Sequence, residues 1–400
     1  MTRYIGTVAR GIRAPIFKDG DNLAEMVPQL IINAANAEGY SIRNRDVIAL
    51  TESIVARTQG NYATVEDIKN DVIKKLEGRT EIGLTLPILS RNRFSILLKG
   101  IAAATEKVII QLSFPADEVG NRLFDDYLMI GSGINPWHEV LDEEQFLKAF
   151  GKTKHPFTGV DYISIYRDIV EEAGAECKII FANDCRKILD YTKNVIACDI
   201  HTREQSIAQL KAAGAEFVMG LADILNDPTE QHGFNEEYGL LGSNKASETE
   251  IKLFPRDCQK IVDQIAGRMY ALTEKNVEVM IYGDGAFKDP IGKIWELADP
   301  VVSPAFTPGL IGTPNELKLK YIADNEYKDL SSDEQKVLIT KRIQERKALK
   351  DKPIDSEESE GTTPRQITDL LGSLSDLVSG SGDKGTPIVY IQGYFDNYAD

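Results

Sequence analysis

The stretch Val277–Pro290, VEVMIYGDGAFKDP, joins an apolar run to a group of glycines and acids. The run Val277–Tyr282 is followed at once by turn residues, which is typical of a buried strand. Asp284 would then lie at the carboxyl end of that strand, where open α/β sheets usually place their sites. The glycines on either side of it let the backbone turn sharply or approach a ligand closely. A carboxylate there can hold a magnesium or manganese ion, although an isolated G-D-G is more often a tight turn with solvated acids.

The composition is that of an ordinary globular protein. The chain has 400 residues, of which 42% are hydrophobic and 27% are charged, enough for two or three domains. Its formal net charge of -16 argues against a nucleic-acid backbone or an anionic membrane as the main partner. No apolar run is long enough for a membrane span and no signal peptide is visible, so we expect a cytoplasmic protein. The four cysteines form no C-x-x-C pair, so neither a zinc site nor a disulfide framework is indicated.

The N-terminal region carries a second candidate site. Asn22 followed by Glu25 predicts a capping box, and the apolar residues behind it recur at helical spacing. Further on, a short apolar run that reads as a buried strand leads directly into Glu52, Ser53 and Arg57. Polar groups and a cation just past a strand can grip a phosphate, and the alternative is a solvated loop.

The middle of the chain alternates strands with helices from about residue 161 to residue 226. This pattern predicts parallel βαβ units. Two of its strands end at acids, Asp184 and Asp199, which we interpret as helix caps rather than ligands. No G-x-G-x-x-G follows any of these strands, so a dehydrogenase ranks last among the hypotheses.

The predicted fold is α/β (α+β), with a mixed-sheet body and an inserted lobe. The body is expected from residues 1–80 and 234–400, and a small parallel α/β subdomain from residues 81–233. Repeated prolines and glycines from Pro300 to Pro314 predict a long ordered loop or a lid without regular structure. An apolar stripe from Ile367 to Leu377 predicts a helix, and Pro387–Gln392 a final strand.

An ordered set of segments resembles the coenzyme F-420:γ-glutamyl ligase family. GIRAPIFKDGDNLAEMV and RDVIALTESIVARTQG are similar to the N-terminus of that family, which has L-P-x-I-x-x-G-D-D-L followed by D-G-D-V-L-V-x-x-S-K-x-x-S-K-A-E-G. YGLLGSN and VMIYGDGAF look like its N-A-G-I-D-x-S-N and I-x-x-D-[ST]-x-G-R-x-x-R, and SLSDLVSGSGDKGTPIVYIQGY looks like its closing segment. The stretch from about Glu81 to Gly233 is longer than the family's equivalent, which indicates a divergent member with a large internal insertion.

The resemblance implies a reaction and a set of residues. The family uses GTP and a divalent metal to join the amino group of glutamate to a substrate carboxylate through an acyl phosphate. For this chain it implies GTP or ATP, magnesium or manganese, a small carboxylate substrate with glutamate, and a homodimer. The implied nucleotide-binding residues are Ala14, Pro15, Ile16, Phe17, Glu52, Ser53 and Arg57. The implied metal ligands are Asp284 and Asp289, and the implied substrate-binding residues are Asn244 and Lys288.

The chain also departs from the family pattern. The aspartate of N-A-G-I-D falls near Leu241, which cannot bind metal, and FKDPIG replaces G-R-x-x-R. Asp289 or an acid of the insertion would have to replace the lost ligand. The deazaflavin coenzyme is therefore a poor candidate substrate. A γ-glutamyl or other amide ligation on a different carboxylate, folate-like for instance, is as plausible as the family's own reaction. The alternative hypothesis is a catalytically inactive ligase-fold binding protein whose insertion carries the function.

Overall fold

The computed structural model describes residues 4–156, 158–284, 301–314, 317–347, 365–379 and 384–397. The chain divides into two compact units, each with its own internal contacts. The first contains residues 1–17, 21–54 and 257–400, and the second contains residues 18–20 and 55–256. No described helix is long and apolar enough to cross a membrane.

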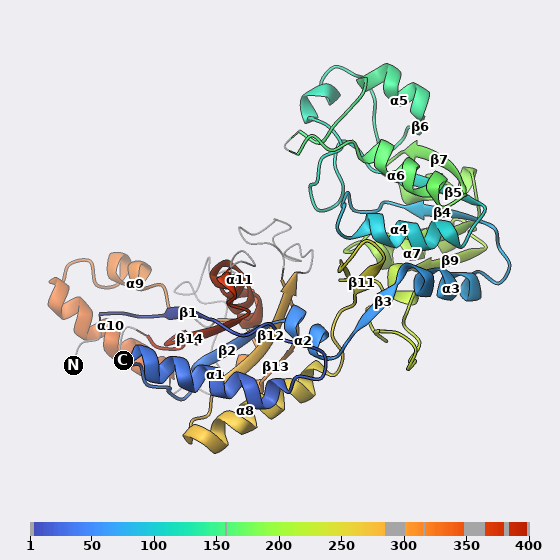
Figure 1. Ribbon diagram of the computed structural model, residues 1–400. Coiled ribbons are helices and arrows are strands. Elements are labelled where there is room, and N and C mark those ends of the chain that lie inside the picture. The colour runs from blue at the N-terminus through green and yellow to red at the C-terminus, as the bar shows by residue number, and fades with distance from the viewer. Residues whose placement is uncertain are drawn as a thin grey trace. The chain divides into compact units, whose positions relative to one another are not determined.

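The first unit is built on a five-stranded mixed sheet (Figure 1). Its central strands β2 (Val47–Thr51) and β12 (Glu278–Asp284) run parallel. Strand β12 is the buried strand that the apolar run at Val277 predicted. The other neighbouring pairs are antiparallel. The strand order is β1 (Val8–Ile12), β14 (Ile388–Gln392), β2, β12 and β13 (Val301–Phe306).

Helices cover both faces of this sheet. Because side chains alternate along a strand, Val47 and Ala49 face α11 (Ile367–Ser379), whereas Ile48 and Leu50 face the other way. Helices α1 (Leu23–Glu38) and α8 (Cys258–Thr273) pack against each other and against the opposite side of the sheet (Figure 1). The other described helices of the unit are two short ones, η4 (Pro308–Leu310) and α9 (Leu319–Asn325), and the longer α10 (Ser332–Lys347).

Two local predictions in this unit were wrong. The proline-rich segment after residue 300 begins with strand β13 rather than with irregular structure. Pro304 is tolerated because β13 is an edge strand and its register with β12 shifts at this point, so no ladder donor is needed there. At the start of α1, Asn22 is the N-cap residue but its side chain makes no cap hydrogen bond, and Glu25 instead forms an ion pair with Arg268 at 2.8 Å.

The second unit contains a six-stranded sheet whose strands are parallel except for the edge strand β6 (Leu141–Asp142). The parallel pairing confirms the βαβ pattern. The strand order is β6, β7 (Glu176–Phe181), β5 (Lys107–Leu112), β4 (Glu81–Thr85), β8 (Asn194–Ala197) and β9 (Phe217–Gly220). The chain order reverses between β4 and β8, which makes this a doubly wound sheet.

Helices also lie on both faces of the parallel sheet. Ile110 and Leu112 belong to the core beneath α3 (Val65–Leu76), α4 (Phe94–Ala103) and α6 (Tyr162–Glu172). Ile109 packs on the other side against η2 (Cys185–Asp190) and α7 (Arg203–Ala212). The remaining elements of the unit are α2 (Glu52–Thr58), which begins in the first unit, β3 (Tyr62–Thr64), η1 (Asp126–Met129), α5 (Glu143–Phe150), η3 (Leu221–Asp223), β10 (Asn244–Lys245) and β11 (Glu250–Lys252).

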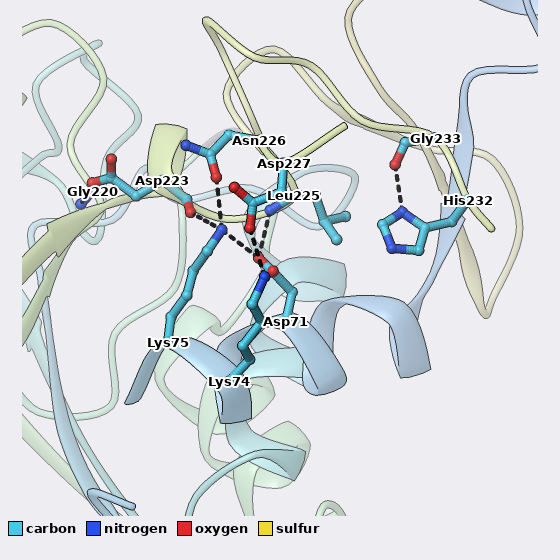
Figure 2. A network of polar contacts seen from close by, with 10 residues as sticks. All are labelled: Asp71, Lys74, Lys75, Gly220, Asp223, Leu225, Asn226, Asp227, His232 and Gly233. Atoms are coloured by element: carbon cyan, nitrogen blue, oxygen red, sulfur yellow. Dashed lines mark hydrogen bonds and ion pairs between the residues drawn. The ribbon is translucent and has the colours of Figure 1, made fainter. Parts of the chain in front are cut away.

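A lysine on α3 ties the segment after β9 to the rest of the second unit (Figure 2). The Lys75 ammonium donates to Asp71 at 2.8 Å, to the Asn226 side-chain oxygen at 2.7 Å and to the Asp223 carbonyl. The Leu225 N–H donates to the same Asp71 carboxylate at 2.7 Å. Both charged side chains are largely shielded from water, so this network holds the segment by charge-assisted hydrogen bonds.

The predicted fold class is confirmed, because a mixed sheet and a largely parallel sheet are combined with helices. The mixed sheet is assembled from strands before residue 52 and after residue 277, and the strands of the largely parallel sheet all lie between Glu81 and Gly220. The second compact unit extends beyond these strands in the sequence on both sides, since it includes residues 55–256. The domain limits at 81 and 233 stay a prediction.

Candidate functional site

The pairing of the mixed sheet brings several predicted site segments to one edge. A row of residues in register crosses four of its strands, and these are Ile12, Ile388, Leu50 and Ile281. Beyond this row lie the segments that follow β1, β2 and β12 and the segment that precedes β14. Ala14–Phe17, Glu52, Ser53 and Asp284 are therefore on the same edge of the sheet, although they are far apart in the sequence.

Backbone hydrogen bonds hold these segments together. The Ala14 N–H donates to the Gly385 carbonyl at 3.0 Å, and the Thr51 N–H donates to the Pro387 carbonyl at 3.1 Å. In the predicted nucleotide segment, Phe17 is buried while Ile16 is 79% exposed. The segment is thus anchored at its ends and presents an apolar side chain outward between them.

Glu52 is the buried acid of this edge. It is the first residue of α2, directly after β2, and only 4% of its surface is exposed. Its side chain lies against Gly283 of β12, where an added Cβ would come within 2.2 Å of the Glu52 Cγ. Gly283 is therefore needed as a strand residue without a side chain, whereas the G-D-G pattern predicted either a sharp turn or close approach to a ligand.

Asp284 is the last described residue of β12, and only its backbone is described. It is paired with Val301 of β13 and follows Gly283, so its backbone lies at the strand end beside Glu52. The other predicted ligand, Asp289, and the predicted substrate residue Lys288 lie outside the described residues. Within the described ranges, no group of three or more histidine, cysteine or acidic side chains is placed to hold a metal ion.

The other predicted residues are Ser53, Arg57 and Asn244. Ser53 is half-buried, and its N–H donates to the Thr51 hydroxyl at 3.4 Å. Arg57 is exposed near the end of α2 and belongs to the second unit. Asn244 also belongs to the second unit, where its side-chain oxygen accepts from the Arg93 guanidinium at 3.1 Å. Leu241, at the position of the family's aspartate, is buried in the apolar core of that unit.

At the carboxyl ends of the parallel strands in the second unit, several backbone N–H groups donate to the chain's own carboxylates. Asp117 accepts from the Leu89 N–H at 2.7 Å and from backbone N–H groups of its own loop. Glu118 accepts from the N–H groups of Ile200, His201 and Thr202, just before α7. These N–H groups, which follow β4 and β8, are the type that binds phosphate in doubly wound proteins, and here they already have acceptors.

The two acids predicted as helix caps differ. Asp184 is the N-cap of η2, and its side chain accepts from the Arg186 N–H at 3.0 Å, as predicted. Asp199 is not a cap, because the N-cap of α7 is Thr202. Asp199 is instead fully buried and accepts from the hydroxyls of Thr202 and Ser206 at 2.6 and 2.7 Å.

The chain matches the model of a known protein family. The model of the F420-0:gamma-glutamyl ligase family matches residues 11–393, nearly the whole chain. The chain belongs to this family. The match includes the predicted nucleotide segment, the whole parallel sheet and the final strand. No curated protein matches the chain significantly.

Proposed function

We propose that this protein is a nucleotide- and divalent-metal-dependent amide ligase of the γ-glutamyl type. The observation that carries the proposal is the convergence of Ala14–Phe17, Glu52 and Asp284 on one edge of the mixed sheet. Family membership supports the same reaction class. The nucleotide would be GTP or ATP, and the metal would be magnesium or manganese.

The donor chemistry of this edge suits such a metal. Carboxylate oxygens are preferred ligands of magnesium and manganese, and Glu52 is a buried carboxylate beside the strand end that carries Asp284. We assign Glu52 and Asp284 as oxygen donors, with Asp289 as a further donor. When bound, the ion supplies positive charge against the phosphate oxygens.

The reaction needs two displacements. A carboxylate oxygen of the acceptor attacks the γ-phosphorus, the bond to the bridging oxygen breaks, and the nucleoside diphosphate leaves. The glutamate amine then attacks the acyl carbon, the bond to phosphate breaks, and inorganic phosphate leaves as the amine loses a proton. Positioning and electrostatic stabilisation are what a protein contributes to phosphoryl transfer. In our proposal Ala14–Phe17 lies along the nucleotide and Lys288 contacts the substrate. Arg57 and Asn244 belong to the second unit, and their roles as a phosphate cation and a substrate contact rest on the family resemblance alone.

Nucleotide binding can be tested by thermal shift. We expect GTP or ATP to raise the melting temperature with magnesium or manganese but not with a chelator, because a ligand that binds only the native state stabilises it. Glu52→Gln should lower the metal-dependent affinity by about tenfold or more, since one charged donor is lost. The matched control is Glu38→Gln at the exposed C-terminal end of α1, which should leave the affinity unchanged. Absence of any shift with both nucleotides and both metals would refute the site.

Turnover is the second test. Glutamate and a panel of small carboxylates, folate-like acceptors included, should release nucleoside diphosphate and phosphate in equal amounts. Nucleotide binding without turnover on any acceptor would favour the alternative, a binding protein on the ligase fold.

A further inference from the structure

The second unit has a cavity of its own, apart from the proposed ligase edge. Its volume is about 470 Å³, and it lies at the carboxyl ends of the parallel strands, on the face covered by η2 and α7. Its walls come from four places: Leu86 after β4, the loop that carries Trp137 and His138, the segment Asn183–Lys187 after β7, and Thr202 with side chains of α7 such as Ser206 and Gln209. In doubly wound proteins, ligands bind outside this end of the strands.

An exposed tryptophan stands at the cavity. Trp137 lines it and is 62% exposed, which is unusual for so large an apolar side chain. Its loop is ordered, because the Asn135 side chain accepts from the Trp137 N–H at 3.0 Å. The Pro136 carbonyl also accepts from the Asn183 N–H at 2.7 Å, which fixes this loop to the end of β7. These bonds fix the backbone of the loop, and the exposed indole that it carries offers a surface on which a planar ring can stack.

The charge of the lining favours an anion. Arg186 and Asp184 form an ion pair at 2.7 Å, so their charges largely offset each other. Lys187 is a further cation of the lining, and within the described ranges it forms no ion pair. The lining thus contains two cations, Arg186 and Lys187, and one carboxylate, Asp184, which leaves one positive charge in excess.

Two buried polar groups stand directly behind the lining. The Gln111 side chain donates to the carbonyls of Ala182 and Asp184, at 2.9 and 2.8 Å, while its oxygen has no partner among the described residues. Asp199 accepts from the lining hydroxyls of Thr202 and Ser206, while its Oδ1 has no partner among the same residues. A buried acceptor without a donor costs stability, and such costs concentrate at functional sites.

The lining does not provide a thiol nucleophile. Cys185 lines the cavity, but burial raises the pKa of its thiol to about 11. A thiol with that pKa is neutral near pH 7, and thiolate is the reactive form. The N–H groups of His201 and Thr202, just before α7, are also unavailable to an anion, because they already donate to Glu118. The cavity is therefore suited to binding, with Lys187 as its anion contact.

We propose that this cavity binds a small molecule that combines a planar ring with an acidic group, the ring stacking on Trp137 and the acid contacting Lys187. Nucleoside monophosphates and aromatic carboxylates share this chemistry. The proposal concerns the second unit alone and does not depend on the ligase reaction.

The test uses Trp137 as its own reporter. The sequence has two tryptophans, so Trp295→Phe leaves Trp137 as the single indole. AMP, GMP, nicotinate and 4-aminobenzoate are titrated into this full-length variant while its fluorescence is followed, and calorimetry on the unmodified protein confirms the affinity. We expect at least one probe to bind with a Kd of about 100 μM or tighter. If only AMP or GMP binds, the cavity accepts a phosphate as the acidic group. If only nicotinate or 4-aminobenzoate binds, it accepts a carboxylate.

Matched variants decide whether binding occurs in this cavity. Trp137→Ala and Lys187→Gln, followed by calorimetry, should each weaken binding by about tenfold or more. Tyr127→Ala removes another exposed aromatic side chain of the same unit, and Lys193→Gln removes an exposed lysine outside the lining. Both should change the Kd less than about twofold, as should Glu52→Gln. The proposal is overturned if none of the four probes binds at millimolar concentration, or if Trp137→Ala and Lys187→Gln leave binding intact.

Discussion

The two sheets use the carboxyl ends of their parallel strands in different ways. In the first unit, β2 and β12 end side by side, and the buried side chain of Glu52 lies on a glycine of the neighbouring strand. In the second unit, Asp117 and Glu118 follow β5 and accept hydrogen bonds from the loops after β4 and β8. In the first unit, several chain segments thus lie around the buried acid Glu52. In the second unit, the acids Asp117 and Glu118 instead stabilise the loops by accepting their backbone hydrogen bonds.

This difference shows why sheet topology alone does not identify a site. The doubly wound order of the second unit is typical of nucleotide-binding proteins. Its backbone donors are nevertheless satisfied internally by Glu118, and the sequence has no glycine fingerprint after these strands. The mixed sheet has a less familiar order, yet it places Ala14–Phe17, Glu52, Ser53 and the backbone of Asp284 on one edge. Function must therefore be argued from the side chains at the edge.

The largest expected effect is on the edge of the first unit. Gly283→Ala should weaken metal-dependent nucleotide binding by about a hundredfold, near 3 kcal/mol, because its Cβ would displace Glu52 or the strand. The measurement is nucleotide affinity by calorimetry in the presence of magnesium or manganese. The control is Gly267→Ala on α8, where a Cβ meets nothing within 4 Å and helix propensity improves. Equal affinities of the two variants would show that the contact between Glu52 and Gly283 is not part of the site.

The next effect concerns pH and the second unit. Burial raises the pKa of Asp117 from 3.8 to about 6, although it accepts several hydrogen bonds. Because the folded state holds this proton more tightly than the unfolded state, the stabilising contribution is complete below about pH 4. It is lost as pH rises through about 6, and it amounts to about 3 kcal/mol. The free energy of unfolding from urea titrations between pH 4 and 7 should include this decrease, and Asp117→Asn should remove it. A variant with the same pH dependence as the unmodified protein would contradict the assignment.

The smallest expected effect is a loss of stability when the Lys75 network, which holds the segment after β9, is broken. Lys75→Met should lower the free energy of unfolding by about 2 kcal/mol, because the shielded carboxylate of Asp71 loses its charged donor. Lys69→Met, on the same helix, breaks an exposed ion pair with Glu66 and should cost less than about 0.5 kcal/mol. Urea unfolding of both variants gives the comparison. Similar costs for the two would mean that the network in Figure 2 is only a surface feature.

Much of the fold followed from local pattern. The apolar run at Val277 and the alternation between residues 161 and 226 predicted strands and helices that the structure contains. Strand β13 was missed because proline normally argues against a strand, and only its place at the sheet edge makes Pro304 acceptable. Asp199 was misinterpreted because a carboxylate just after a strand has the same local pattern whether it caps a helix or is buried behind one.

The sequence by itself determined the periodicity of each element, the acids at the strand ends and the resemblance to a ligase family. The first two depend only on neighbouring residues, because side-chain periodicity is a local property of helices and strands. The resemblance depends on the order of short segments along the chain. Only the tertiary structure decided that β2 and β12 are neighbours, that Glu52 lies against Gly283, and that Glu118 accepts from the segment before α7. The reason is physical. Strand pairing and burial are set by contacts between residues far apart in the chain, which no local pattern specifies.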